Sequence, residues 1–105
     1  MNLFRLFQRS KPGEHKLRYV VKGDSDDYNV TYKCSTGSQV VQEPHVRKGW
    51  KHLFRGHKGD YIYLSAQSNK PHSEVNLYIY EDGKLVDKIV KKGDFPLAQV
   101  SDEVH

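Results

Sequence analysis

Residues 75–90 constrain the fold of this chain more than any other stretch. Val75, Leu77 and Ile79 alternate with polar or aromatic residues, and this two-residue period is typical of a strand with two unlike faces. The Asp82-Gly83 dipeptide that follows favours a type I′ turn, which needs positive φ at both central positions. Another run rich in apolar residues comes after the turn. The stretch therefore predicts a β-hairpin.

A two-residue loop also fixes which residues of this hairpin face each other. We expect Glu81 to pair with Lys84, Tyr80 with Leu85, Ile79 with Val86, and Val75 with Val90. One face then carries Val75, Leu77, Ile79, Val86 and Val90, and the opposite face carries Tyr78, Tyr80 and Leu85. The apolar face must be covered by a second layer of the protein.

The rest of the chain repeats the pattern of short alternating runs separated by turn residues. We expect further strands at residues 16–22, 28–33, 39–46, 50–55, 61–67 and 97–100. Pro44 inside the third of these indicates an edge strand or a bulge, because proline cannot donate to a sheet ladder. Seven or eight short strands without a helical period after residue 12 predict an all-β sandwich or a small barrel.

Length and composition favour a single domain. The chain has 105 residues, of which 36% are hydrophobic, enough for only one thin core. We expect a flexible basic arm at residues 1–13, a sandwich domain at 14–101 and a short tail at 102–105. No run of about 18 apolar residues exists, so no transmembrane segment is predicted. The arm lacks the apolar core of about 7–15 residues that marks a signal peptide, which favours a cytoplasmic location.

A basic stripe accompanies the predicted fourth strand. Between residues 46 and 59 there is no acidic residue, and the stripe consists of Arg47, Lys48, Lys51, Arg55 and Lys58. Trp50, His52 and Phe54 share one face of the strand. We expect Trp50 and Phe54 to bridge two sheets in the core, which turns Lys51 and Arg55 outward. Such a stripe suits phosphate binding; alternatively, it keeps an edge strand soluble and unpaired.

A second candidate surface is the tyrosine-rich face of the hairpin. Tyr78, Tyr80 and Leu85 lie opposite the predicted core face, and Tyr63 of the preceding strand is a further candidate member. Tyrosine gives a large contact area at little entropic cost, so this face predicts a partner-binding surface. The alternative is that the N-terminal arm or another strand covers it.

The sequence offers little for catalysis or metal binding. His45, His52 and His57 surround the predicted third and fourth strands, but there is no HxH pair or CxxC motif, and we expect no metal and no cofactor. Ser65 and Cys34 are candidate nucleophiles, yet no nucleophile elbow or glycine-rich loop accompanies them. The only cysteine is Cys34, so no intramolecular disulfide can form. We therefore predict that the protein is not an enzyme.

Four motifs follow one another in an order that resembles a known family. They are VTY at 30–32, Trp50 followed by Phe54, GDYIYLSAQ at 59–67, and the hairpin motif IYEDGK at 79–84. This order resembles small bacterial β-sandwich proteins of the MmpS-like type. The resemblance implies an immunoglobulin-like antiparallel sandwich without catalytic residues. We expect a non-catalytic protein-interaction or structural module, with an anion- or nucleic-acid-binding module as the alternative.

Overall fold

The computed structural model describes residues 13–105, which form eight antiparallel β-strands and no helix. The strands are β1 (Glu14–Gly23), β2 (Tyr28–Lys33), β3 (Val41–Val46), β4 (Trp50–His57), β5 (Tyr61–Ser68), β6 (Ser73–Glu81), β7 (Lys84–Gly93) and β8 (Leu97–Glu103). The predicted all-β class is confirmed, and the predicted strands match these with small shifts at their ends. Because residues 13–105 contain no helix, this part of the chain has no candidate membrane-spanning helix.

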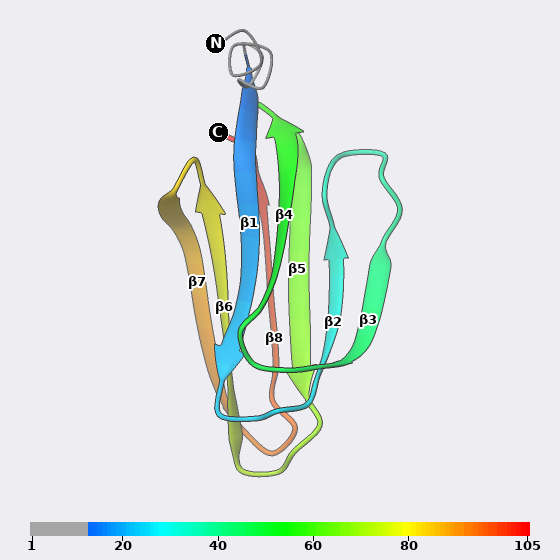
Figure 1. Ribbon diagram of the computed structural model, residues 1–105, viewed down its shortest axis with the longest axis vertical. Helices are drawn as coiled ribbons and strands as arrows, with labels where there is room; N and C mark the ends of the chain where they lie inside the picture. Colours follow the sequence, from blue (N-terminus) through cyan, green and yellow to red (C-terminus); the bar gives the residue numbers. More distant parts are fainter. Residues whose placement is uncertain (1–12) are drawn as a thin grey trace, which may run out of the picture.

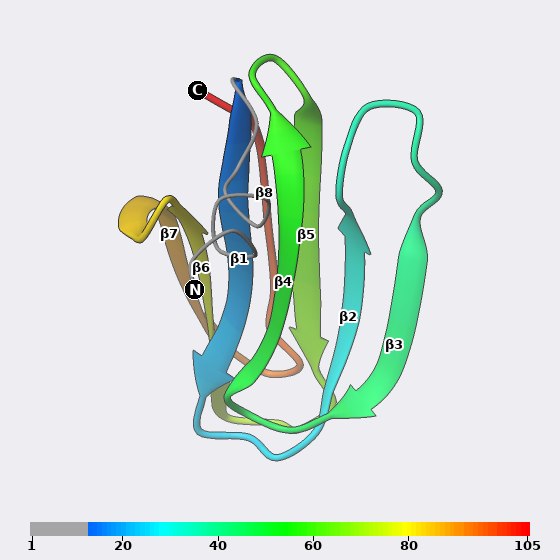
Figure 2. The ribbon, with the colours of Figure 1, turned by 45° about the horizontal axis from the view of Figure 1, so that its top comes forward.

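The strands form two packed four-stranded sheets, so the predicted sandwich is confirmed. Sheet A has the order β4-β1-β6-β7 and sheet B the order β3-β2-β5-β8. Figures 1 and 2 show that β2 and β3 extend sideways beyond β4 in both views. The topology differs from that of an immunoglobulin constant domain, because β1 and β2 lie in opposite sheets, whereas the first two strands of such a domain are neighbours.

The core lies between the sheets and follows the predicted alternation. Its buried side chains are Leu17, Tyr19, Val21, Tyr28, Val30, Tyr32, Ile62, Leu64, Ala66, Val75, Leu77, Ile79, Ala98 and Val104. Burying one large apolar side chain contributes about 1.5–3 kcal/mol, so this thin layer supplies most of the driving force for folding.

Three buried tyrosines bond through their hydroxyl groups, two of them between the sheets and the third, Tyr32, within sheet B. Tyr19 in sheet A donates to the carbonyl of Lys33 in sheet B. Tyr28 in sheet B donates to the carbonyl of Glu74 in sheet A at 2.7 Å. Tyr32 donates to Glu43 at 2.7 Å. Each buried hydroxyl is therefore satisfied, which is the condition for placing tyrosine in a core.

The β6–β7 hairpin confirms the predicted turn but not the whole predicted register. Asp82 and Gly83 have φ of 51° and 83°, as a type I′ turn requires. Tyr80 pairs with Leu85 and Glu81 with Lys84, as expected. A bulge then shifts the pairing, so that Ile79 faces Asp87 instead of Val86, and Val75 faces Lys91 instead of Val90.

The bulge reverses the predicted faces of β7. An extra residue in one strand moves every later side chain to the other face. Val86 and Val90, predicted to be core residues, are therefore 37% and 44% exposed. Asp87 and Ile89 take the inward positions and are half-buried.

The C-terminal boundary also differs from the prediction. The segment 102–105 is not a tail, because β8 continues to Glu103 and pairs with β5 through Asp102. Val104 is buried, and its N–H group donates to the carbonyl of Asp60 at 2.9 Å. β1 begins at Glu14, which is the expected start of the domain and two residues before the expected start of the strand. Residues 1–12 of the predicted arm lie outside the described residues.

The aromatic side chains of β4 line one edge of the sandwich. Trp50 and Phe54 are half-buried and pack against the core, which is less than the full burial predicted for them. The Trp50 ring lies 5.4 Å from that of Tyr32 in the other sheet, and its Nε1 donates to Glu43 at 3.2 Å. The Phe54 ring lies 4.7 Å from that of Tyr19. Trp50 thus bridges the sheets, but at their edge.

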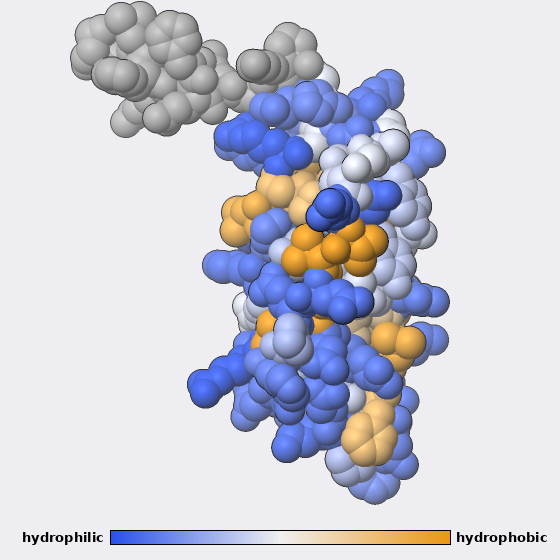
Figure 3. Space-filling model, turned by 90° about the vertical axis from the view of Figure 1, so that its right-hand side faces the viewer, coloured by the Kyte–Doolittle hydropathy of each residue, from blue (hydrophilic) through white to orange (hydrophobic). Residues whose placement is uncertain are grey.

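β3 is an edge strand with a bulge, as Pro44 predicted. The register shifts between Tyr28 and Val30 of its partner strand, and His45 has a positive φ of 58°. Figure 3, which looks at the side that lies on the right in Figure 1, shows apolar side chains only as separate patches in a mostly hydrophilic surface. This side therefore offers no continuous apolar interface.

Candidate binding surface

The outer face of sheet A brings together the two surfaces that the sequence predicted separately. β1 pairs with both β4 and β6, so Arg18 lies beside Leu53 on one side and Tyr80 on the other. Tyr80 in turn pairs with Leu85. These four residues form a row across all four strands of the sheet.

A second row lies next to the first. Val20 pairs with Lys51 of β4 and with Tyr78 of β6, and Tyr78 pairs with Lys88 of β7. Alternate residues of a strand are about 7 Å apart, so the two rows are neighbours on one surface. Lys51 of the basic stripe and most of the tyrosine face are therefore parts of a single surface.

Basic side chains cover the two tyrosine rings of this surface. The Arg18 guanidinium lies 4.3 Å from the centre of the Tyr80 ring. Lys22 and Lys88 lie 5.5 and 5.7 Å from the centre of the Tyr78 ring. The negative face of an aromatic ring attracts cations, and both tyrosines are consequently half-buried. The surface thus presents positive charge above its rings.

A shallow hollow lies in the middle of this surface. Its lining is Arg18, Val20, Lys22, Gly49, Lys51 and Tyr80. Three of these residues are cations, and Nε of Arg18 is fully buried without a hydrogen-bond partner among residues 13–105. A buried donor without an acceptor costs about 1–3 kcal/mol. The hollow therefore combines three positive charges with a buried donor that no acceptor satisfies among residues 13–105.

The predicted basic stripe runs along β4, and only its middle joins the hollow. Lys51 and Arg55 point outward from β4, as expected. Arg47 and Lys48 lie in the β3–β4 turn, and Lys58 lies in the β4–β5 turn at the other end of the strand. Lys48 lies 3.8 Å from Asp26, and Arg55 lies 3.5 Å from Glu14. The five residues are therefore not one site.

Tyr63 does not belong to the tyrosine surface. It lies in β5 of sheet B, where its hydroxyl donates to Gln99 at 3.2 Å. The prediction that it joins Tyr78 and Tyr80 is wrong, because alternation assigns a residue to a face of its strand but not to a sheet. Leu85 does lie beside Tyr80, with 49% of its surface exposed.

The histidines considered for metal binding are not brought together. His45 bonds to Asp27 at 2.9 Å, and His57 lies 3.9 Å from Asp60. His52 is stacked between the rings of Trp50 and Phe54. Within residues 13–105, the ligand atoms that do gather belong to His15, Glu81 and Asp82, which the sequence did not single out.

The two candidate nucleophiles have no basic partner in the described part of the chain. Ser65 is buried in β5, and Cys34 is half-buried. Burial raises the pKa of the Cys34 thiol, which disfavours the reactive thiolate. Between residues 13 and 105, no histidine is hydrogen-bonded to either side chain.

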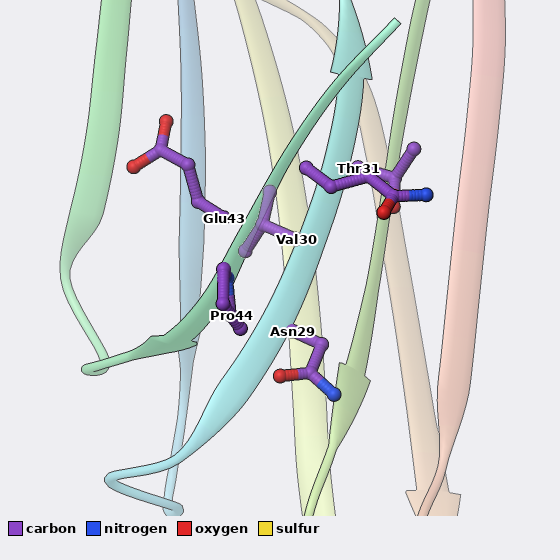
Figure 4. A pocket seen from close by; sticks show the side chains of 6 residues that line it. Asn29, Val30, Thr31, Glu43 and Pro44 are labelled. Atoms are coloured by element: carbon purple, nitrogen blue, oxygen red, sulfur yellow. The ribbon is translucent and has the colours of Figure 1, made fainter.

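A hollow between β2 and β3 results from the bulge there. It is lined by Asn29, Val30, Thr31, Gln42, Glu43 and Pro44 (Figure 4). The Glu43 carboxylate points away from Asn29 and already accepts hydrogen bonds from Tyr32 and Trp50. The remaining lining groups are uncharged. This hollow therefore has no group free to hold a charged ligand.

A pair of carboxyl groups at the β7–β8 edge was not predicted. Asp87 points inward because of the bulge, and its Oδ2 is fully buried with no hydrogen-bond partner among residues 13–105. Burial, followed by the adjacent Asp102 carboxyl, raises the pKa of Asp87 to about 7. The hairpin register predicted from the sequence places Asp87 on the solvent side, so the sequence did not predict a buried carboxyl at this position.

Comparisons with known proteins do not assign this surface to a family. No family model matches the chain, and no curated protein matches it either. The resemblance to MmpS-like sandwiches therefore stays a prediction.

Proposed function

We propose that this protein is a non-catalytic binding module, and that the outer face of sheet A binds an acidic, partly apolar segment of another protein. The observation that carries the proposal is the central hollow, whose lining contains the three cations Arg18, Lys22 and Lys51. A carboxylate of the partner accepts from Arg18 and is held by the two lysines. Hydrogen bonds of this charge-assisted kind are stronger than neutral ones.

Apolar side chains beside the hollow favour a protein over a nucleic acid. Leu53 and Leu85, which are 66% and 49% exposed, stand at the two ends of the row that contains Arg18 and Tyr80. Tyrosine and arginine flanked by apolar groups are typical of protein interfaces. Nucleic-acid bases stack on open aromatic faces, whereas basic side chains already cover the rings of Tyr78 and Tyr80.

Two further observations support a non-catalytic role. Ser65 and Cys34 have no histidine partner in residues 13–105, and the half-buried thiol favours its protonated form. The MmpS-like resemblance also implies a domain without catalytic residues.

Selection of binders from a random displayed-peptide library tests the proposal. We expect the selected peptides to be rich in Asp and Glu interleaved with apolar residues. Their affinity should fall at least about tenfold in Arg18→Glu/Lys51→Glu, which is a loss of about 1.4 kcal/mol. Tyr80→Ser/Leu85→Ser should weaken binding without changing its salt dependence.

The matched control is Lys33→Glu/Tyr63→Ser, which changes the same kinds of residue on the outer face of sheet B. This variant should bind the selected peptides as well as the wild type does. Peptides that bind all variants equally would refute the proposal. Tighter binding of a poly-dT oligonucleotide, with a steep fall in affinity as salt rises, would instead support the nucleic-acid alternative.

A further inference from the structure

Three metal-ligating side chains meet at one end of the sandwich. Nδ1 of His15 is 2.6 Å from Oδ2 of Asp82 and 3.8 Å from Oε2 of Glu81, and the three ligand atoms lie within 4.8 Å of one another. Figure 1 shows the start of β1, the β6–β7 turn and the C-terminus at this same end. Residues 13–105 contain no other such group of histidine, cysteine and carboxylate side chains.

Backbone N–H groups orient both carboxylates toward His15. The N–H of Lys16 donates to Oδ1 of Asp82 at 2.9 Å, and the N–H of His105 donates to Oε1 of Glu81 at 2.9 Å. Each carboxylate thus uses one oxygen for the fold and turns the other toward the imidazole. Hydrogen bonds that fix ligand orientation in this way are characteristic of metal sites.

We propose that His15, Glu81 and Asp82 bind a divalent transition-metal ion of the zinc type. Two ligand atoms on a tetrahedral zinc ion are about 3.3 Å apart, given metal–ligand distances of about 2.0–2.2 Å. The distances of 2.6 and 3.8 Å from His15 lie on either side of that value, so small side-chain movements form the site. One imidazole and two carboxylates suit zinc or cobalt, whereas magnesium and calcium prefer oxygen ligands alone.

The bound ion would link segments that are distant in the sequence. His15 lies at the start of β1, Asp82 lies in the β6–β7 turn, and Glu81 holds the backbone of His105. Since these groups come together only in the folded chain, metal binding stabilises the fold by mass action. The fourth position on the ion remains open to water.

Zinc titration followed by calorimetry and thermal unfolding tests the site. We expect one Zn²⁺ per chain and a rise in the thermal midpoint of about 10 °C when free zinc is about a hundred times Kd. His15→Ala should lower zinc affinity by more than about 100-fold, because losing a ligand costs more than losing a residue that only orients one. Co²⁺ should give visible absorption bands that the same variant removes.

Two sets of variants separate metal ligation from structural effects. Glu81→Gln and Asp82→Asn keep an amide oxygen for the backbone N–H groups, and asparagine tolerates the positive φ of position 82, yet each should reduce zinc affinity. His72→Ala removes another histidine paired with an aspartate, at 3.3 Å from Asp94, and should leave zinc binding unchanged. The proposal is wrong if zinc leaves the midpoint unchanged, or if His15→Ala and His72→Ala alter binding equally.

Discussion

Replacing Asp87 with asparagine should stabilise the protein at neutral and alkaline pH. The bulge in β7 turns this carboxyl into the edge of the sandwich beside Asp102, and its Oδ2 is buried without a partner in residues 13–105. Burial and the neighbouring carboxyl together raise the pKa of Asp87 from 3.8 to about 7. An asparagine has nearly the same shape, carries no charge and can donate to Asp102.

The pKa shift determines both the sign and the size of the effect. Between pH 4 and 7 the folded protein holds a proton on Asp87 that the unfolded chain has lost, so stability falls as pH rises through this window. A shift from 3.8 to about 7 corresponds to about 4 kcal/mol at 1.36 kcal/mol per unit. Solvent screens a carboxyl at the rim of a sandwich, which reduces the expected effect to roughly 1–2 kcal/mol.

Urea denaturation at a series of pH values measures this effect. The wild type should lose roughly 1–2 kcal/mol of unfolding free energy between pH 4 and pH 8, and Asp87→Asn should remove most of that slope. Asp102 serves as the contrast, because its pKa is lowered, so its influence lies below pH 4. If the variant and the wild type lose equal stability over pH 4–8, Asp87 is not the group responsible and the reasoning fails.

Two further predictions concern packing. Gly23→Ala should lower the unfolding free energy by at least about 3 kcal/mol, because the added Cβ would lie 2.2 Å from both the Tyr28 hydroxyl and the Glu74 carbonyl. The control is Gly37→Ala in the same denaturation assay. Gly37 also has a positive φ but has open space around it, so this change should cost only about 1 kcal/mol. Trp50→Ala should lower the unfolding free energy by about 2–3 kcal/mol, because Trp50 is half-buried at the edge of the sandwich. A fully buried core tryptophan would cost roughly 3–5 kcal/mol, so a measured loss above about 4 kcal/mol would contradict the edge position.

Local alternation was enough to predict most of the strands and the inward face of β6. It could not predict the bulge in β7, because both possible faces of that strand are mixed. One face carries Val86, Lys88 and Val90, and the other carries Asp87 and Ile89. The structure turns Lys88 outward over Tyr78 and brings Asp87 inward, where burial raises the pKa of its carboxyl. Side chains outside the strand decide between the two registers, so the strand alone cannot reveal them.

The candidate surface was only partly predictable for a related reason. Tyr78, Tyr80 and Leu85 come from one hairpin, whose short loop fixes their positions, and they were predicted together correctly. Lys51 lies on the same surface as these residues because β1 pairs with both β4 and β6, two strands that are far apart in the sequence. The sequence does not single out Arg18, because a cation within a strand is usually a solvated side chain. Nε of Arg18 is buried because β1 has β4 on one side and β6 on the other.

β1 contributes to the candidate metal site, to the candidate binding surface and to the bond between the sheets, because it lies in the interior of sheet A. It contributes His15 to the candidate metal site, Arg18 to the outer face and Tyr19 to the bond between the sheets. A strand rises about 3.3 Å per residue, so His15 and Arg18 are about 10 Å apart, and effects at that distance usually add. Zinc binding and peptide binding can therefore be measured in the same chain as separate quantities. Loss of Tyr19 would instead disturb both, because the sheet that carries them is tied to sheet B through its hydroxyl.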